Sequence, residues 1–313
     1  MSMIKVDLIT GFLGSGKTTF IKMYAKHLID SGLKVGILEN DYGAVNVDMM
    51  LLKELEGDNC GLEMVAGACD ADCHRRRFKT KLIALGMSGY DRIIIEPSGI
   101  FDIDEFFDVL HESPLDRWYE QGSVIAVVDA RLEDELSENS SYLLASQIAM
   151  SGLVVLSKTQ LADKKDITNT IGRLNAALEN VKCPRKITSS EIIAKPWSKF
   201  DDCDFERVKN CGCRAESFVK LLSESGEFYQ TLYYLDVRAD ENSLKNAVKN
   251  LFEDKNCGSV FRVKGFVRKG EKWIELNATR SELTIRESDC GQDIVIVIGE
   301  SLNKDNIERI MSF

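Results

Sequence analysis

The sequence predicts a doubly wound, mostly parallel α/β domain followed by a smaller α+β domain. Two observations lead to this prediction. An apolar run over residues 3–10 is followed by a glycine-rich segment and then by apolar residues at helical spacing over residues 17–30. Further continuous apolar runs, each ended by a polar residue, recur up to residue 156, as expected for parallel strands that are buried on both faces.

The elements of the first domain follow in order. Ser31 and Gly32 end the first helix, because glycine commonly closes a helix C-terminus, and residues 33–38 form the next strand. Helical segments between the strands complete parallel crossovers, so we assign residues 1–190 to this domain. The other strands predicted in it contain residues 93–95, 124–128 and 153–156.

The rest of the chain divides into a linker and a second domain. Residues 191–226 are polar, carry cysteines and show little periodicity, so we assign them to a linker. Residues 227–313 form the second domain, in which a helix lies on one side of a mostly antiparallel sheet. Its predicted strands are 228–237, 259–268, 271–277 and 293–298, and its predicted helices are 242–253 and 303–311.

Composition limits the classes of function. The chain has 313 residues, a formal net charge of −10 and a pI near 5.0, which argues against nucleic acid as a partner because nucleic-acid binding needs a basic patch. No apolar run reaches the roughly 18 residues of a membrane helix, and the first residues lack a signal-peptide pattern, so we expect a cytoplasmic protein with no membrane partner. In a reducing compartment, we expect its nine cysteines to be free thiols or metal ligands.

Residues 11–19 predict a phosphate-binding loop. Two glycines separated by four residues are followed by a lysine and a hydroxyl residue, and such a loop turns its N–H groups onto phosphate oxygens at the positive end of a helix. We expect Lys17 to reach the β- and γ-phosphates and Thr18 to bind Mg²⁺ through its hydroxyl. The nucleotide-binding residues of this loop are Gly11, Gly14, Ser15, Gly16, Lys17, Thr18 and Thr19.

A second acid is needed at the end of a neighbouring strand to hold the hydrated Mg²⁺. Glu96 directly follows an apolar run and meets this need, while the N–H of Gly99 could contact the γ-phosphate and move when that phosphate leaves. Asp41 is our prediction for a second Mg²⁺ contact or a contact with the attacking water. Lys17, Asp41 and Glu96 are therefore the predicted catalytic residues, although Glu96 and Asp41 also fit an ordinary strand end and turn.

The loop after residues 153–156 is expected to bind the base. It reads Ser157-Lys158-Thr159-Gln160, whereas guanine-specific proteins have Asn, Lys, any residue and Asp, whose carboxylate accepts both guanine N1–H and the exocyclic amine. Lys158 can still cover the face of the ring, but Gln160 offers one acceptor and one donor. This change weakens the expected preference for guanine and leaves open whether the chain binds GTP or ATP.

Several motifs in a fixed order resemble one known family. They are residues 11–19, residues 39–48, the Glu96-Pro97-Ser98-Gly99 turn, the strand ending at Asp129 and, in the second domain, residues 260–267, Trp273 and residues 297–299. Together they resemble the CobW-like GTPases, relatives of hydrogenase and urease nickel-insertion GTPases. The resemblance implies a GTPase that uses GTP and Mg²⁺, turns over slowly and hands a metal ion to a client metalloprotein, or helps to assemble a metal or corrinoid cofactor. Whether the chain forms a homodimer stays open.

The same resemblance implies a transition-metal site. Family members carry a Cys-x-Cys-Cys motif after the first switch, often joined by an upstream glutamate that matches Glu39. This chain instead has Cys69 and Cys73, with two aspartates between them, followed by His74. Thiolate, imidazole and carboxylate suit Zn²⁺ or another transition metal, so Glu39, Cys69, Cys73 and His74 are the implied ligands. The alternative is that both cysteines are free thiols at the start of a helix near Asp72.

A second thiolate site is a weaker hypothesis. Cys203, Cys211 and Cys213 lie in the polar segment and could bind metal or a client, or could be unpaired linker cysteines. Three functions stay open at this point. They are an NTP-hydrolysing metal chaperone or cofactor-assembly activator, a P-loop kinase that phosphorylates a small molecule with Arg75 to Arg77 as its arginine cluster, and a nucleotide-gated adaptor without significant hydrolysis.

Overall fold

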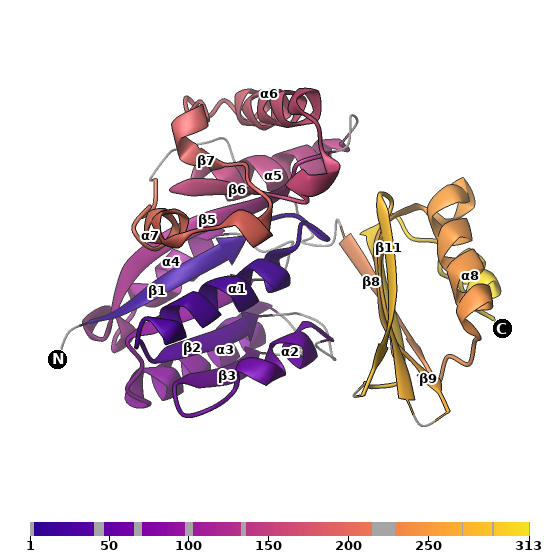
Figure 1. Ribbon diagram of the computed structural model, residues 1–313, viewed down its shortest axis with the longest axis horizontal. Helices are drawn as coiled ribbons and strands as arrows, with labels where there is room; N and C mark the ends of the chain where they lie inside the picture. The colour runs from indigo at the N-terminus through magenta and orange to yellow at the C-terminus, as the bar shows by residue number, and fades with distance from the viewer. Residues whose placement is uncertain are drawn as a thin grey trace. The chain divides into compact units, whose positions relative to one another are not determined.

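The chain forms two compact units, Met1–Leu222 and Ser223–Phe313, which are considered one at a time (Figure 1). A computed structural model describes residues 3–40, 47–65, 71–97, 103–132, 136–214, 229–270, 272–289 and 291–312.

The first unit is built on a parallel sheet of seven strands in the described part of the chain. The strand order is β3-β2-β4-β1-β5-β6-β7, so β1 lies between β4 and β5 near the centre. Loops at the carboxyl ends of such strands form the usual ligand crevice of doubly wound sheets. The strands are β1 (Ile4–Thr10), β2 (Val35–Asn40), β3 (Cys60–Val65), β4 (Arg92–Pro97), β5 (Tyr119–Asp129), β6 (Leu153–Ser157) and β7 (Ile192–Ile193).

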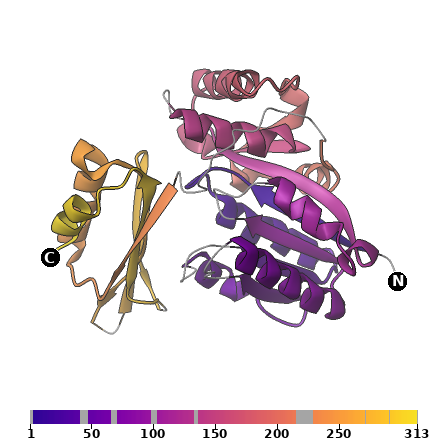
Figure 2. The same ribbon diagram turned by 180° about the vertical axis from the view of Figure 1, so that it is seen from behind.

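Helices cover both faces of this sheet, as the two opposite views show (Figures 1 and 2). Side chains of α1, α2 and α7 pack on one face, and those of α3, α4, α5 and α6 belong to the cores of the other. The bounds are α1 (Lys17–Asp30), α2 (Val47–Leu52), α3 (Ala71–Met87), α4 (Ile103–Leu110), α5 (Glu138–Ala149), α6 (Lys164–Asn180) and α7 (Asp202–Lys209).

The apolar run in β4 shows why a continuous hydrophobic stretch becomes a central parallel strand. Ile93, Ile94 and Ile95 are all fully buried. Their side chains alternate, so Ile94 joins the core with Phe20 of α1, while Ile93 and Ile95 join the core with Phe78 of α3. A strand with only one buried face would have needed polar residues at every second position.

The second unit is an antiparallel sheet with helices on one face. Its described strands are ordered β11-β10-β9-β12-β8, and the apolar sides of both helices share one core with β9 and β12. Figure 2 shows both helices on the same side of this sheet. The elements are β8 (Tyr229–Leu235), α8 (Glu241–Glu253), β9 (Ser259–Lys269), β10 (Lys272–Thr279), β11 (Glu282–Ser288), β12 (Ile294–Glu300) and α9 (Lys304–Met311).

The predicted fold class is confirmed, whereas part of the predicted linker is folded. Ile192 and Ile193 form β7, which pairs with β6 at the edge of the first sheet. Asp201 then caps α7, whose Phe205 and Val208 are buried against α1 and neighbouring strands. Because these apolar residues join the first core, the part of the 191–226 segment up to residue 214 belongs to the first unit. Residues 215–228 lie outside the described residues.

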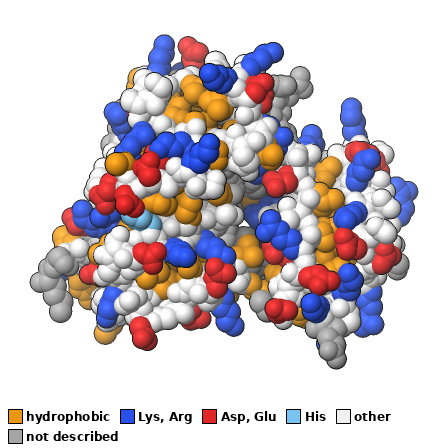
Figure 3. All heavy atoms as spheres, in the orientation of Figure 1, with side chains coloured by type: hydrophobic (Ala, Val, Ile, Leu, Met, Phe, Trp, Pro, Cys, Tyr) orange, Lys and Arg blue, Asp and Glu red, His pale blue; other side chains and the backbone are white. Residues whose placement is uncertain are grey.

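The surface of the molecule carries charges of both signs. Figure 3 shows basic and acidic side chains intermixed over the face in view, unlike the single basic patch of a typical nucleic-acid footprint. None of the helices in the described ranges has the length and apolar composition that crossing a bilayer requires.

Candidate nucleotide and metal site

The loop between β1 and α1 has the geometry of a phosphate cradle. Gly11, Gly14 and Gly16 have φ angles of +144°, +75° and +92°, a region that favours glycine. A Cβ atom at Gly11 would collide with the carbonyl oxygen of Val127, so only glycine lets the loop lie this close to β5. Helix α1 begins directly after Gly16, and its first N–H groups are therefore available to an anion.

Lys17, Thr18 and Glu96 come together at the start of α1. Lys17 Nζ donates to the Gly11 carbonyl oxygen at 3.0 Å and lies 3.6 Å from Glu96 Oε1. Thr18 Oγ1 donates to Glu96 Oε2 at 3.1 Å. All three side chains are buried. A hydroxyl and a carboxylate at this separation are the oxygen ligands that Mg²⁺ prefers, so the residues present fit this ion.

Several buried polar atoms near the carboxyl ends of the parallel strands lack hydrogen-bond partners among the described residues. Buried polar groups are normally paired, so such a group indicates a missing ligand or water. These atoms come from the loop after β1, the last residue of β2 and the segments after β5, β6 and β7. They are Ser15 Oγ, Asn40 Oδ1, Arg131 Nε and Nη2, Thr159 Oγ1 and Trp197 Nε1.

The predicted base loop lies beside the phosphate loop. Lys158 adopts a left-handed conformation with φ +53°, and its Nζ lies 2.9 Å from Asp129 Oδ2 at the end of β5. A Cβ at Gly16 would lie 3.7 Å from Ser157 Cβ and 2.9 Å from Trp197 Cη2. The end of β6 and the segment after β7 therefore both lie close to the residue that precedes α1. No motif predicts this role for Trp197, which follows Pro196 in the segment predicted as linker.

Glu39 lies one strand away from Glu96. The two residues are in register in the parallel pair β2 and β4, so their side chains lie on the same face of the sheet, and both are buried. Glu39 is also in register with Met64 of β3. This places one predicted transition-metal ligand next to the predicted Mg²⁺ ligand.

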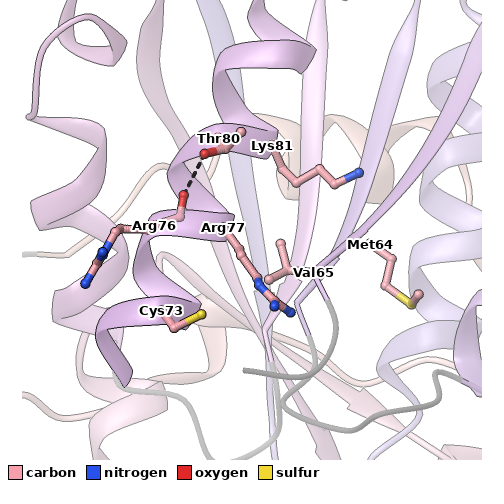
Figure 4. A pocket seen from close by; sticks show the side chains of 7 residues that line it. All are labelled: Met64, Val65, Cys73, Arg76, Arg77, Thr80 and Lys81. Atoms are coloured by element: carbon pink, nitrogen blue, oxygen red, sulfur yellow. Dashed lines mark hydrogen bonds between the residues drawn. The ribbon is translucent and has the colours of Figure 1, made fainter. Parts of the chain in front are cut away.

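Cys73 and His74 lie in the first turn of α3. The helix begins at Ala71, close to the predicted start near Asp72, and His74 is buried. Cys73 opens into a pocket of about 470 Å³ between α3 and the end of β3. Figure 4 shows Arg77 and Lys81 extending from α3 toward β3 in this pocket. Its lining residues are Met64, Val65, Cys73, Arg76, Arg77, Thr80 and Lys81.

Asp41, Cys69 and Gly99 lie outside the described residues. Among the predicted residues that the structure describes, Thr19 is exposed in the first turn of α1 and Gln160 is exposed in a short 3₁₀ helix, Thr159–Leu161.

Neither set of predicted metal ligands is grouped within the described ranges. No three His, Cys, Asp or Glu side chains come together there as metal ligands, and this holds for Cys203, Cys211 and Cys213 and also for Glu39, Cys73 and His74. Cys203 is exposed on α7, whereas the thiol of Cys213 donates to the Met150 carbonyl. Burial raises the pKa of Cys211 to about 11 and also raises the pKa of Cys213, so both are neutral thiols near pH 7 in the metal-free protein.

The doubly wound fold and the glycine-rich loop between β1 and α1 define a P-loop nucleotide-binding protein. The family model for the CobW/HypB/UreG nucleotide-binding domain matches residues 5–187, and the model for the cobalamin synthesis protein cobW C-terminal domain matches residues 231–312. The chain therefore belongs to the CobW/HypB/UreG family of GTPases.

Two relatives are similar to this chain over most of its length. The zinc chaperone YjiA of Escherichia coli is 32% identical over an alignment 290 residues long, which covers 88% of this chain and 83% of that protein. The zinc-regulated GTPase metalloprotein activator 1 of Dictyostelium discoideum is 25% identical over an alignment 304 residues long, which covers 84% of this chain but less than two thirds, 62%, of that protein. The crystal structure of Zn(II)-bound YjiA GTPase aligns with 100% of this chain and 99% of that chain at 18% identity and a TM-score of 0.38. Since that score is low, the family assignment depends on the sequence matches.

Proposed function

We propose that this chain is a GTP- and Mg²⁺-dependent metal chaperone that delivers Zn²⁺, or another transition metal, to a client metalloprotein. The names of its relatives, a zinc chaperone and a zinc-regulated metalloprotein activator, support this cargo. The residues of this chain support it through the chemistry of Glu39, Cys73 and His74, because thiolate, imidazole and carboxylate together suit Zn²⁺.

One observation carries the proposal, namely the register of Glu39 and Glu96. Glu96 accepts a hydrogen bond from Thr18 and lies near Lys17, which supports its proposed role as an Mg²⁺ ligand, whereas Glu39 is the proposed cargo ligand on the adjacent strand. A buried carboxylate responds to any change of charge on its neighbour because the interior screens charges weakly. A change at Glu96 on nucleotide binding or hydrolysis would therefore alter the affinity of Glu39 for its metal ion.

Hydrolysis would depend on positioning and electrostatics. Lys17 would leave the Gly11 carbonyl for the phosphate oxygens, where its ammonium and the loop N–H groups stabilise the charge of the transferred phosphoryl group. Magnesium bound by Thr18 and Glu96 would neutralise further charge. Asp41 and Gly99 remain the proposed contacts of the attacking water and the γ-phosphate. Turnover is expected to be slow without a client or metal.

One proposed cargo ligand, Cys73, is accessible, which suits transfer of the ion, whereas Glu39 and His74 are buried. Cys73 lines a pocket, so an incoming ligand from a client can approach its thiol without unfolding α3. We propose Cys69 as the second thiol of the site, together with Glu39 and His74. A site that holds its ion with accessible ligands exchanges the ion more readily than a closed structural site.

The test is a titration of Zn²⁺, Co²⁺ and Ni²⁺ into the wild type and a Cys69→Ser/Cys73→Ser variant. Each protein is measured with GDP and with a non-hydrolysable GTP analogue. We expect the variant to bind Zn²⁺ at least about ten-fold more weakly, and the wild type to differ roughly five-fold or more between its two nucleotide states. Cys203→Ser is the matched control, because Cys203 is an exposed thiol on α7, and it should behave as wild type.

The same material distinguishes the other two functions. Equal metal affinities in all the protein and nucleotide states would contradict the chaperone proposal. Transfer of a labelled γ-phosphate to a metabolite instead of water would favour the small-molecule kinase. Negligible turnover with tight, nucleotide-dependent client binding would favour the adaptor.

A further inference from the structure

Gln160 occupies the position at which guanine-specific loops carry an aspartate. Lys158 O accepts a hydrogen bond from Leu161 N at 2.9 Å, which closes a tight turn around Gln160. Gln160 is exposed in this turn and makes no hydrogen bond to the described part of the chain. The turn lies beside the phosphate loop, because Ser157 approaches Gly16. A carboxamide is therefore presented where a base bound next to the phosphates has to be recognised.

The described acids near this turn are already engaged, so they do not replace the missing aspartate. Asp129 accepts the Arg131 N–H at 2.9 Å through Oδ1 and pairs with Lys158 at 2.9 Å through Oδ2. Asp163 and Asp166 cap α6 reciprocally, each accepting the other's backbone N–H, at 2.8 Å and 3.0 Å. These three carboxylates therefore already have structural partners. Gln160, which is exposed, is the side chain best able to meet the base edge.

The chemistry of the carboxamide differs from that of a carboxylate. Guanine presents two adjacent donors, N1–H and the 2-amino group, and a carboxylate accepts both. A carboxamide accepts N1–H through its oxygen but then turns its NH₂ donor toward the 2-amino donor, and two opposed donors leave each other unsatisfied. Hypoxanthine has a hydrogen at C2 in place of the amino group, so the amide NH₂ no longer faces another donor. Xanthine has a carbonyl there, which accepts the amide N–H and completes a bidentate pair.

We propose that Gln160 reads the purine edge with one acceptor and one donor, so that the 2-amino group of guanine is not recognised and a purine with a 2-carbonyl binds best. The inference rests on the proposed nucleotide site and refines its ligand class to nucleotides of 6-oxopurines, which carry the N1–H donor. GTP then binds this chain mainly through its phosphates and Mg²⁺, while the base contributes little selection for guanine.

The experiment measures the affinities of GDP, IDP and XDP, with Mg²⁺, for the wild type and a Gln160→Glu variant. Glutamate has the same length as glutamine and restores the carboxylate, and the exposed position makes the exchange compatible with folding. For the wild type, we expect GDP and IDP to bind within about three-fold of each other and XDP to bind roughly five-fold or more tightly than GDP. For the variant, the order should reverse, with GDP tighter than IDP and XDP the weakest.

Three results would overturn the inference. Wild-type binding of GDP that exceeds IDP by more than about three-fold would show that the 2-amino group is recognised, and this ratio needs no variant. Wild-type binding of XDP no tighter than GDP would exclude the donor role of the amide. Either result leaves the nucleotide site itself standing, whereas a failure of all three nucleotides to bind would remove the site and the inference together.

Discussion

The first unit buries two groups of oppositely charged side chains. In the group at the amino end of β4, both oxygens of the Asp7 carboxylate accept hydrogen bonds. Asp7 of β1 accepts hydrogen bonds from Arg92 Nη1 at 2.6 Å, Tyr24 Oη at 2.8 Å and Ser123 N at 2.8 Å. Arg92 also donates to the Lys209 carbonyl, which ties α7 to the sheet. Burial raises the pKa of the Asp7 carboxyl, and Arg92 counteracts this rise. This group supports the framework.

In the second group, near the carboxyl ends of the strands, the opposite charges lie farther apart. Lys17 and Glu96 are 3.6 Å apart, and the lysine ammonium donates to the Gly11 carbonyl of its own loop. Ser15 Oγ, in the same loop, has no hydrogen-bond partner in the described residues. A buried charge that stabilises a fold has its hydrogen bonds complete, whereas one that serves a ligand keeps them replaceable. The contrast between the two groups separates structural from functional charges in this sheet.

Replacement of Arg92 is expected to have the largest effect. Arg92→Ala removes the main partner of Asp7 and leaves a buried carboxylate without its countercharge, which should lower the free energy of unfolding by about 3–5 kcal/mol. Urea unfolding followed by circular dichroism measures this loss. An Asp7→Asn/Arg92→Ala double variant should recover part of it, because the charge is gone. A loss below about 1 kcal/mol in the single variant would mean that the pair is not structural.

Replacement of Lys17 should affect ligand binding but not folding. Lys17→Ala removes the ammonium that meets the phosphates, and we expect about 100-fold weaker binding of Mg²⁺-GTP. The nucleotide-free variant should unfold close to the wild-type urea concentration, because Glu96 keeps its hydrogen bond from Thr18. Calorimetric titration and urea unfolding provide the two values. Undiminished nucleotide binding would refute the assignment of the phosphate loop.

Replacement of Glu96 should have the smallest effect of the three. Glu96→Gln keeps one oxygen but removes the charge, and about ten-fold weaker binding of GDP in the presence of Mg²⁺ is expected, with no change in EDTA. Thr18→Ser, which preserves the hydroxyl, is the matched control and should resemble the wild type. Equal losses with and without Mg²⁺ would argue that Glu96 acts on the loop and not on the ion.

The parts of the fold with strong local signals could be predicted from the sequence. The glycine loop predicted the positions of β1 and α1, and the run at Ile93 to Ile95 predicted the core of β4. Strand β3 was missed because Gly61 and Glu63 interrupt its short apolar pattern. Helix α7 was missed although its signal is present, since Asp201 and Asp204 form a capping box and Phe205 and Val208 share one face.

The arrangement of the candidate site could be predicted only in part. A residue that follows a strand, such as Glu96, was assigned from its position alone. The register of Glu39 with Glu96 depends on β4 being inserted between β2 and β1, and strand order is a long-range property that local patterns do not encode. The proximity of Trp197 to the start of α1 could not be predicted for the same reason, because the two segments are far apart in the chain.

Polar atoms without hydrogen-bond partners in the described part of the chain lie at the ends of the parallel strands, where a nucleotide would bind. The thermal stability of the protein should therefore depend on the nucleotide concentration. A ligand that binds the native protein alone shifts the unfolding equilibrium, by about 2.7 kcal/mol at a concentration 100 times its dissociation constant. The protein in a cell rich in purine triphosphates is then more durable than the same protein in a starved cell. Depletion of the nucleotide would raise the fraction of unfolded chain that proteases can cleave.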